Sequence, residues 1–127
     1  MRSARWFTCC SRWPPHSEIL RIRRASPSGW LGKFDPQQVT WFPAHYSSER
    51  MKTMVLDELD SRGIWAGRPE MWYSNLSRVG NIGSASIFVI LDEMLNDGMI
   101  SPGDTLLCMV PESGRFAVSF MHLTAVG

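Results

Sequence analysis

The amino-acid sequence predicts an α/β domain that occupies only part of the chain. From residue 34 onward, strand-like apolar runs alternate with helical patterns in the order strand, helix, strand, helix, strand, strand. The chain has 127 residues, 44% of them hydrophobic, which is enough for one small domain but not for two. Residues 1–33 differ in composition and show neither a helical nor a strand period.

The first segment, residues 1–33, is basic. It holds seven Lys or Arg and one acid, Glu18, for a net charge of +6, whereas residues 34–127 hold six Lys or Arg and eleven Asp or Glu, for a net charge of −5. We interpret residues 1–33 as a disordered or non-native leader. A targeting role and a nucleic-acid-binding arm are the open alternatives, although the segment lacks the apolar core of a secretory signal.

Three cysteines are present, Cys9, Cys10 and Cys108. They imply no disulfide framework, so a reducing, cytoplasmic compartment is the default expectation. His16 and His122 have no partner at ligand spacing, so no metal site and no cofactor are predicted. The longest apolar stretches fall short of the ~20 residues that a membrane span needs. We therefore expect neither a membrane nor a nucleic acid as partner.

The domain begins with a short strand and an outer helix. Residues 39–42 form a strand-like run that ends at Pro43. Ser47 is a good N-cap for a helix over Ser47–Ser61, and Gly63 ends it. The apolar face of this helix consists of Met51, Met54, Val55 and Leu59.

A second helix, Ser84–Asp97, follows a short strand over residues 71–75 and a turn-rich connector over residues 78–83. Apolar side chains cover nearly every side of this helix, which predicts that it is buried on several sides. The 94 residues from 34 to 127 can hardly supply that cover. The domain should therefore dimerise or form part of a larger fold.

Two further strands close the domain, over residues 105–110 and 116–123. The short link at residues 111–114 predicts that they form an antiparallel pair. Together with the two earlier strands they give a mixed sheet of about four strands.

Two polar side chains near the predicted helix starts could stabilise an oxyanion. A neutral imidazole at a helix N-terminus, as at His45, has a lowered pKa and can donate a hydrogen bond to developing negative charge. The amide of Asn81, just before the second helix, could donate to the same oxygen. Position alone favours the simpler interpretations, a surface loop histidine and a turn asparagine.

The remaining candidates carry weaker signals. Gly114 could let the backbone approach a ligand or serve a plain hairpin turn. Glu112 could act as a base, although exposed turn glutamates are commoner. Cys108 lies in an apolar strand and is interpreted as a small buried hydrophobe rather than a nucleophile. The pair Gly80 and Gly83 lacks the strand and helix context of a dinucleotide site.

Three stretches carry a resemblance to a known family. The segment WFPAHYSSER, residues 41–50, resembles the pattern aromatic-x-Pro-His-Gln-Ala-Asn-x-Arg, and NLSRVGNIGSASI, residues 75–87, resembles Asn-Leu-x-x-x-Gly-Asn-Thr-Ser-x-Ala-Ser-Ile. The segment GMISPGD, residues 98–104, resembles Gly-x-Ile-x-x-Gly-Asp. These patterns are similar to the C-terminal part of ketoacyl-acyl-carrier-protein synthase III, in the thiolase-like superfamily. The resemblance covers residues 33–126 and implies the C-terminal part of that fold.

The resemblance implies a decarboxylative Claisen condensation of acyl and malonyl thioesters, as in fatty acid or polyketide-type biosynthesis. In that family a Cys takes the acyl group, while a His and an Asn hold the malonyl thioester oxygen. His45 and Asn81 match this His and this Asn, and Ser48, Arg50 and Gly114 match substrate-binding positions. The implied partners are thioesters of acyl carrier protein or coenzyme A.

The chain also departs from the family pattern. One residue separates Pro43 from His45 where the family has none, and Tyr46-Ser47-Ser48 replaces Gln-Ala-Asn, as in divergent members of secondary-metabolite pathways. No cysteine matches the nucleophile, which belongs to the family's N-terminal half, so the chain is expected to be inactive alone and to form a homodimer or require that half. The alternatives are a non-catalytic partner subunit or interaction module of a full-length synthase, and a truncated gene product.

Overall fold

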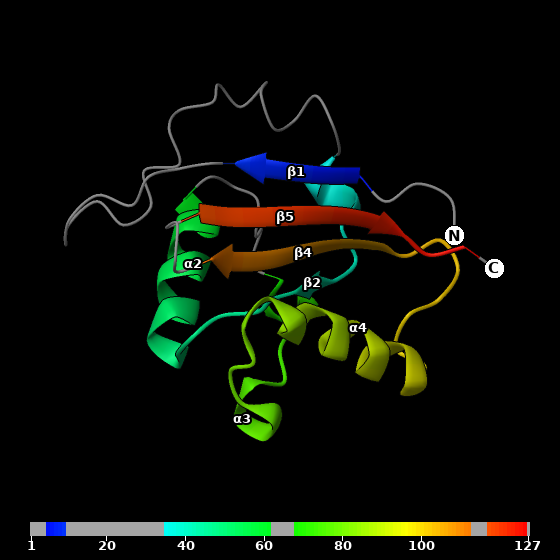
Figure 1. Cartoon of the computed structure of the whole chain (residues 1–127). Helices are drawn as coiled ribbons and strands as arrows, with labels where there is room; N and C mark the ends of the chain where they lie inside the picture. Colours follow the sequence, from blue (N-terminus) through cyan, green and yellow to red (C-terminus); the bar gives the residue numbers. More distant parts are fainter. Residues whose placement is uncertain (1–4, 10–34, 62–67, 113–116, 127) are drawn as a thin grey trace.

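The computed structural model describes residues 5–9, 35–61, 68–112 and 117–126 (Figure 1). The antiparallel sheet consists of β1 (Arg5–Cys9), β5 (Ala117–Thr124) and β4 (Thr105–Glu112), in that spatial order. A parallel pair consists of β2 (Phe42–Pro43) and β3 (Trp72–Tyr73). In place of one mixed sheet, the structure therefore has two hydrogen-bonded sheets.

The two sheets are joined along β2. Isolated parallel bridges pair Trp41 with Leu106 and Ala44 with Met109, so the β2 segment lies between β3 and β4. Pro43 lies between these bridges, and because proline has no N–H it interrupts the ladder towards β4. The strand ends at Pro43 as predicted, and beyond it the backbone N–H of His45 still donates to the carbonyl of Met109 at 2.9 Å.

The longer helices are α2 (Glu49–Ser61) and α4 (Ser86–Asn96), with the single turn of α3 (Leu76–Val79) before α4. Short 3-10 turns precede β2, β3 and α4; they are η1 (Pro36–Gln38), η2 (Pro69–Met71) and η3 (Gly83–Ala85). None of the helices in the described part of the chain is long and apolar enough to cross a membrane.

The helices α2 and α4 pack on opposite faces of the sheet, because side chains alternate along β4 and β5. Leu107 and Met109 of β4 join the core that contains Val55 and Leu59 of α2. The intervening Leu106 and Cys108 join a second core with Ile87 of α4. The fold is thus three layers, helix, sheet and helix.

Several predicted elements are confirmed. The hairpin pairs β4 with β5 in antiparallel register from Thr105–Thr124 to Glu112–Ala117. Both long helices are present but start two residues later than predicted, and Ser84, the predicted cap of the second helix, lies in η3. The predicted helix stop Gly63 lies outside the described residues.

The strand β1 is a difference from the prediction. No strand was expected in residues 1–33, yet Arg5–Cys9 pairs with β5 in antiparallel register. This five-residue run has no strand period of its own, so the pairing depends on the free edge of β5.

The packing of α4 also differs from the prediction. Ile87, Ile90 and Met94 are at most 2% exposed, but Phe88 and Leu95, on the other side of the helix, are 59% and 56% exposed. Within the described residues, α4 is therefore covered on the side that faces the sheet and not on several sides. The apolar composition that predicted full burial leaves an exposed apolar face instead.

Replacement of Ile90 by Ala tests this orientation of α4. Because Ile90 is 1% exposed, we expect its truncation to lower the free energy of unfolding by about 2–5 kcal/mol. The matched control is Phe88→Ala on the exposed side, which should change the free energy of unfolding by ~0.5 kcal/mol or less. Urea unfolding of the chain measures both free energies, and equal losses would contradict the orientation.

Candidate active site

The ends of three strands meet at one edge of the sheet. The β2 segment runs parallel to both β3 and β4, so the carboxyl ends of all three strands lie on the same side. In open α/β sheets, ligands bind outside the carboxyl ends of the strands. Two candidate segments begin there: residues 44–48 after β2 and residues 74–85 after β3.

His45 is fixed at this edge. It is 5% exposed, so it is not the surface loop histidine that position alone favoured. Its neighbours Ala44 and Tyr46 belong to the core on the α2 side, so the alternation of side chains places His45 on the α4 side. Burial lowers the pKa of His45, which keeps the imidazole neutral at pH 7. Burial, and not a helix N-terminus as was predicted, lowers this pKa, because α2 begins four residues later, at Glu49.

Asn81 lies in the turn between α3 and α4. The backbone N–H of Gly83 donates to its Oδ1 at 2.9 Å, which closes a local Asx turn. Gly80 and Gly83 have φ of 79° and 68°, a backbone conformation that glycine adopts without strain. Asn81 is exposed, and because its carbonyl oxygen serves the turn, its amide nitrogen is the group suited to donating to a ligand.

The segments of His45 and Asn81 lie on the same side of the sheet, the side that α4 covers. The helix α4 contacts β2 and β4, and η3, which follows the Asn81 turn, contacts β4 (Figure 1). His45 lies on this same face, at the end of β2. His45 and Asn81 thus belong to two segments that are 36 positions apart in the sequence and lie on the α4 side of the sheet.

The substrate-binding candidates are less closely defined. Ser48 directly precedes α2, and its carbonyl accepts the backbone N–H of Met51 at 2.9 Å. Arg50 is exposed in the first turn of α2. Gly114 and the side chain of Glu112 lie outside the described residues.

Cys108 is confirmed as a buried residue. It is 0% exposed, and burial raises the pKa of its thiol to about 12, so the nucleophilic thiolate is scarcely populated at neutral pH. The side chain of Cys9 and all of Cys10 lie outside the description. Among the described residues, no group of three or more His, Cys, Asp or Glu side chains could hold a metal ion.

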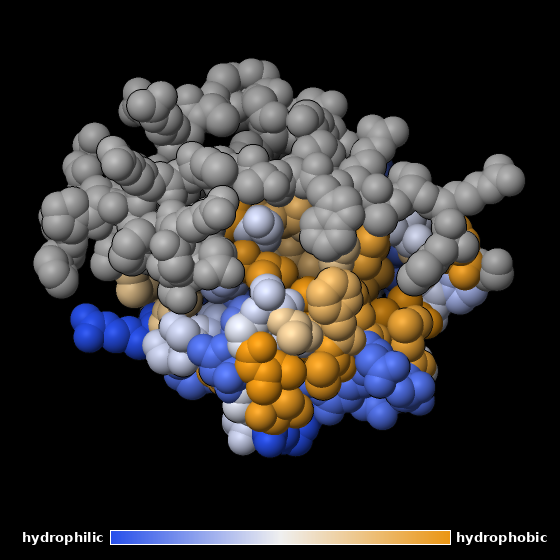
Figure 2. Space-filling model, in the orientation of Figure 1, coloured by the Kyte–Doolittle hydropathy of each residue, from blue (hydrophilic) through white to orange (hydrophobic). Residues whose placement is uncertain are grey.

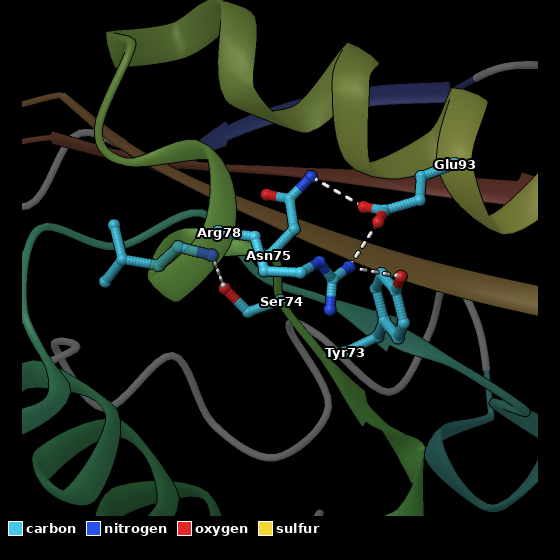
Figure 3. Close-up of polar contacts among 6 residues, drawn as sticks. Tyr73, Ser74, Asn75, Arg78 and Glu93 are labelled. Carbon is cyan, nitrogen blue, oxygen red and sulfur yellow. Dashed lines mark hydrogen bonds and ion pairs between the residues drawn. The ribbon is translucent and has the colours of Figure 1, made fainter.

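One polar cluster beside the site was not singled out by the sequence analysis (Figure 3). Asn75, which follows β3 and is 2% exposed, donates from Nδ2 to Oε2 of Glu93 at 2.8 Å. Arg78 of α3 pairs with the other carboxylate oxygen of Glu93 and donates to the hydroxyl of Tyr73 at 3.3 Å. The sequence indicated it only through the opposite charges of Arg78 and Glu93 on two neighbouring helical segments. This signal is weak, because the pairing also depends on the geometry of the turn between them.

Comparison with known proteins identifies related sequences. Residues 32–119 match the family model described as 3-oxoacyl-[acyl-carrier-protein (ACP)] synthase III C terminal. The beta-ketoacyl-[acyl-carrier-protein] synthase III of Gloeobacter violaceus is 39% identical over 72 residues, which are 57% of this chain and 20% of the relative. That of Synechococcus elongatus is 37% identical over 73 residues, with the same coverage. The chain thus spans about a fifth of the length of these relatives.

Solved structures show the same fold. The synthase III of Thermus thermophilus gives a TM-score of 0.56 at 27% identity and covers 74% of this chain and 27% of its own. A variant of Xanthomonas campestris OleA gives 0.62 at 23% identity, with 76% and 26% covered. At that lower identity the likeness concerns the fold alone, which is the α/β fold of thiolase-like proteins.

A histidine variant tests the buried neutral imidazole. Because burial lowers the pKa of His45 below 6.5, the unfolded chain binds the proton more readily, and acid favours unfolding. Its contribution to stability is complete above pH 6.5 and is lost as the pH falls through the folded-state pKa. We expect wild type to lose up to about 1.4 kcal/mol more than His45→Gln per pKa unit of lowering. Urea unfolding at pH 7.5 and 5.0 measures this difference, and equal losses would contradict it.

Proposed function

The chain belongs to the family of the 3-oxoacyl-[acyl-carrier-protein] synthase III C-terminal domain, and from this premise we propose that it supplies the oxyanion-stabilising part of a condensing acyltransferase. Its substrates would be an acyl thioester and a malonyl thioester of acyl carrier protein or coenzyme A. The observation that supports the proposal is that α4 contacts β2, which leads into His45, while η3, which follows the Asn81 turn, contacts β4 on the same side of the sheet.

The proposed chemistry uses two neutral hydrogen-bond donors. When the malonyl carboxylate leaves as carbon dioxide, the electron pair of the broken C–C bond moves onto the thioester, and negative charge collects on its oxygen. The N–H of neutral His45 and the amide of Asn81 would donate to this enolate oxygen. A pKa lowered by burial suits this role, because the imidazole donates without first becoming a cation. Such a donor is worth roughly 3–4 kcal/mol in acyl-transfer sites.

The acyl-accepting cysteine would come from another polypeptide segment. Cys108 is buried with a raised pKa, and neither Cys9 nor Cys10 matches the family's nucleophile. The enolate carbon would attack the acyl carbon of the Cys thioester, forming the new C–C bond and releasing the Cys thiolate. We therefore propose that this chain alone does not complete the condensation.

The exposed face of α4 is the proposed contact with that segment. Figure 2 shows hydrophobic surface in the lower part of the view, where α3 and α4 lie. The exposed apolar side chains of this region are Val79, Ile82, Phe88, Val89 and Leu95. Because a cluster of exposed apolar side chains marks an interaction surface, we assign it to an N-terminal half of a synthase III-type fold.

An isosteric variant of Asn81 tests the oxyanion role. Asn81→Asp keeps an oxygen for the Gly83 N–H but removes the amide donor, so we expect it to weaken malonyl-coenzyme A binding at least roughly two- to tenfold. Isothermal titration of the full chain measures the affinity. Asn96→Asp, the same change at the exposed end of α4, is the matched control. Equal affinities of both variants and wild type would exclude a donor role for Asn81.

Complementation tests the need for a second segment. Incubation of the chain with radiolabelled acetyl-coenzyme A should give no covalent adduct, and a stoichiometric adduct would contradict the need for a second segment.

A separately expressed N-terminal half of a synthase III should bind the chain, and Phe88→Asp should abolish this binding by placing a charge in the apolar contact. Asp57→Asn on the exposed side of α2 is the control. A homodimer seen by light scattering would point to a second copy instead, and binding without condensation would favour a non-catalytic partner subunit.

A further inference from the structure

The turn that carries Asn81 needs an external support. Residues 80–85 connect α3 to α4 through Gly80 and Gly83, whose positive φ angles a glycine adopts without strain. The hydrogen bonds of its residues are local: Gly80 N–H donates to the Leu76 carbonyl at 2.9 Å, Gly83 N–H donates to Asn81 Oδ1 at 2.9 Å, and Ile82 N–H donates to the Ser86 hydroxyl at 3.3 Å. These bonds shape the turn, but they do not fix its position relative to β3.

The polar cluster of Tyr73, Asn75, Arg78 and Glu93 supplies that support (Figure 3). Its members come from β3, from the segment directly after β3, from α3 and from α4. One carboxylate oxygen of Glu93 accepts from Asn75 and the other from Arg78. The carboxylate thus ties both chain segments before the turn to the helix after it.

Burial and charge both favour one arrangement of the side chains in this cluster. Asn75 is 2% exposed, so its amide needs a partner, and leaving it without one would cost free energy. The hydrogen bond from Asn75, followed by the ion pair with Arg78, lowers the pKa of Glu93 and keeps the acceptor charged. Bonds to a charged acceptor are shorter and stronger than bonds between neutral groups.

We propose that Glu93 is a positioning residue: by holding Asn75 and Arg78, it sets the separation of β3 and α4 and so places the Asn81 amide beside the segment of His45. This inference rests on the proposed function, in which Asn81 is an oxyanion donor. Glu93 itself touches neither substrate nor the reacting atoms.

Amide resonances of the full ¹⁵N-labelled chain test the proposal. The side-chain amide of Asn81 is assigned by its loss in Asn81→Asp. In Glu93→Ala we expect this resonance to shift or broaden, and in Glu93→Gln, which keeps an acceptor for Asn75, we expect a smaller shift. Asp92→Ala, one position away and exposed, should leave the resonance unchanged.

A destabilised control separates positioning from general stability. Val55→Ala lies on the α2 side of the sheet and should lower the melting temperature without moving the Asn81 resonance. A Glu93→Ala spectrum in which the Asn75 resonance shifts but that of Asn81 does not would overturn the proposal. If Glu93→Ala does not fold, the Glu93→Gln shift decides in the same way.

Titration with malonyl-coenzyme A distinguishes the two proposals. We expect the ligand to shift the Asn81 amide in wild type, and to bind Glu93→Ala roughly 10–100-fold more weakly, as is typical when a supporting residue is lost. A resonance that moves in Glu93→Ala but does not respond to the ligand in wild type would disprove the proposed function while supporting Glu93 as the support of the turn. A ligand response that is the same in both proteins would disprove the role of Glu93.

Discussion

The backbone hydrogen bonds of the β2 segment are the constraint on which the rest of the fold depends. Towards β4, the backbone N–H of Leu107 donates to the carbonyl of Trp41 at 3.0 Å, and the backbone N–H of His45 donates to the carbonyl of Met109 at 2.9 Å. Towards β3, Ala44 N–H donates to Tyr73 at 2.9 Å. These bonds align three strand ends in one direction. They also join β3, which leads into the segment of Asn81, to the hairpin of β4 and β5 through the β2 segment.

The chemistry of His45 follows from the same alignment. Residues 42, 44 and 46 lie in the core on the α2 side, so the residue between 44 and 46 faces α4. The extra residue Ala44 after Pro43 therefore decides which face receives the imidazole, because a shift of one position would place it in the other core. Burial on that face gives the neutral form that an oxyanion donor needs.

Local sequence patterns predicted the helices and strands better than the contacts between them. The helix over residues 49–61, the helix over residues 86–96 and the hairpin follow from period and turn residues, and they were predicted with small errors at their ends. The first strand ends at Pro43 as predicted, but it begins at Phe42 and not at residue 39. The hydrogen bond between Asn75 and Glu93 joins residues 18 positions apart. It depends on a turn in which two glycines have positive φ, so the preferences of the two residues alone do not predict it.

The apolar composition of α4 is explained by three different neighbours rather than by one core. Ile87, Ile90 and Met94 face the sheet, and Glu93 holds the segments before the turn. Phe88 and Leu95 face outward, and neither the sheet nor the turn requires them to be apolar. A helix that packed only against the described residues would carry polar residues on this exposed side. The apolar character of this third face is thus explained by a packing partner outside the described residues. The same helix also supports the turn of Asn81 through Glu93.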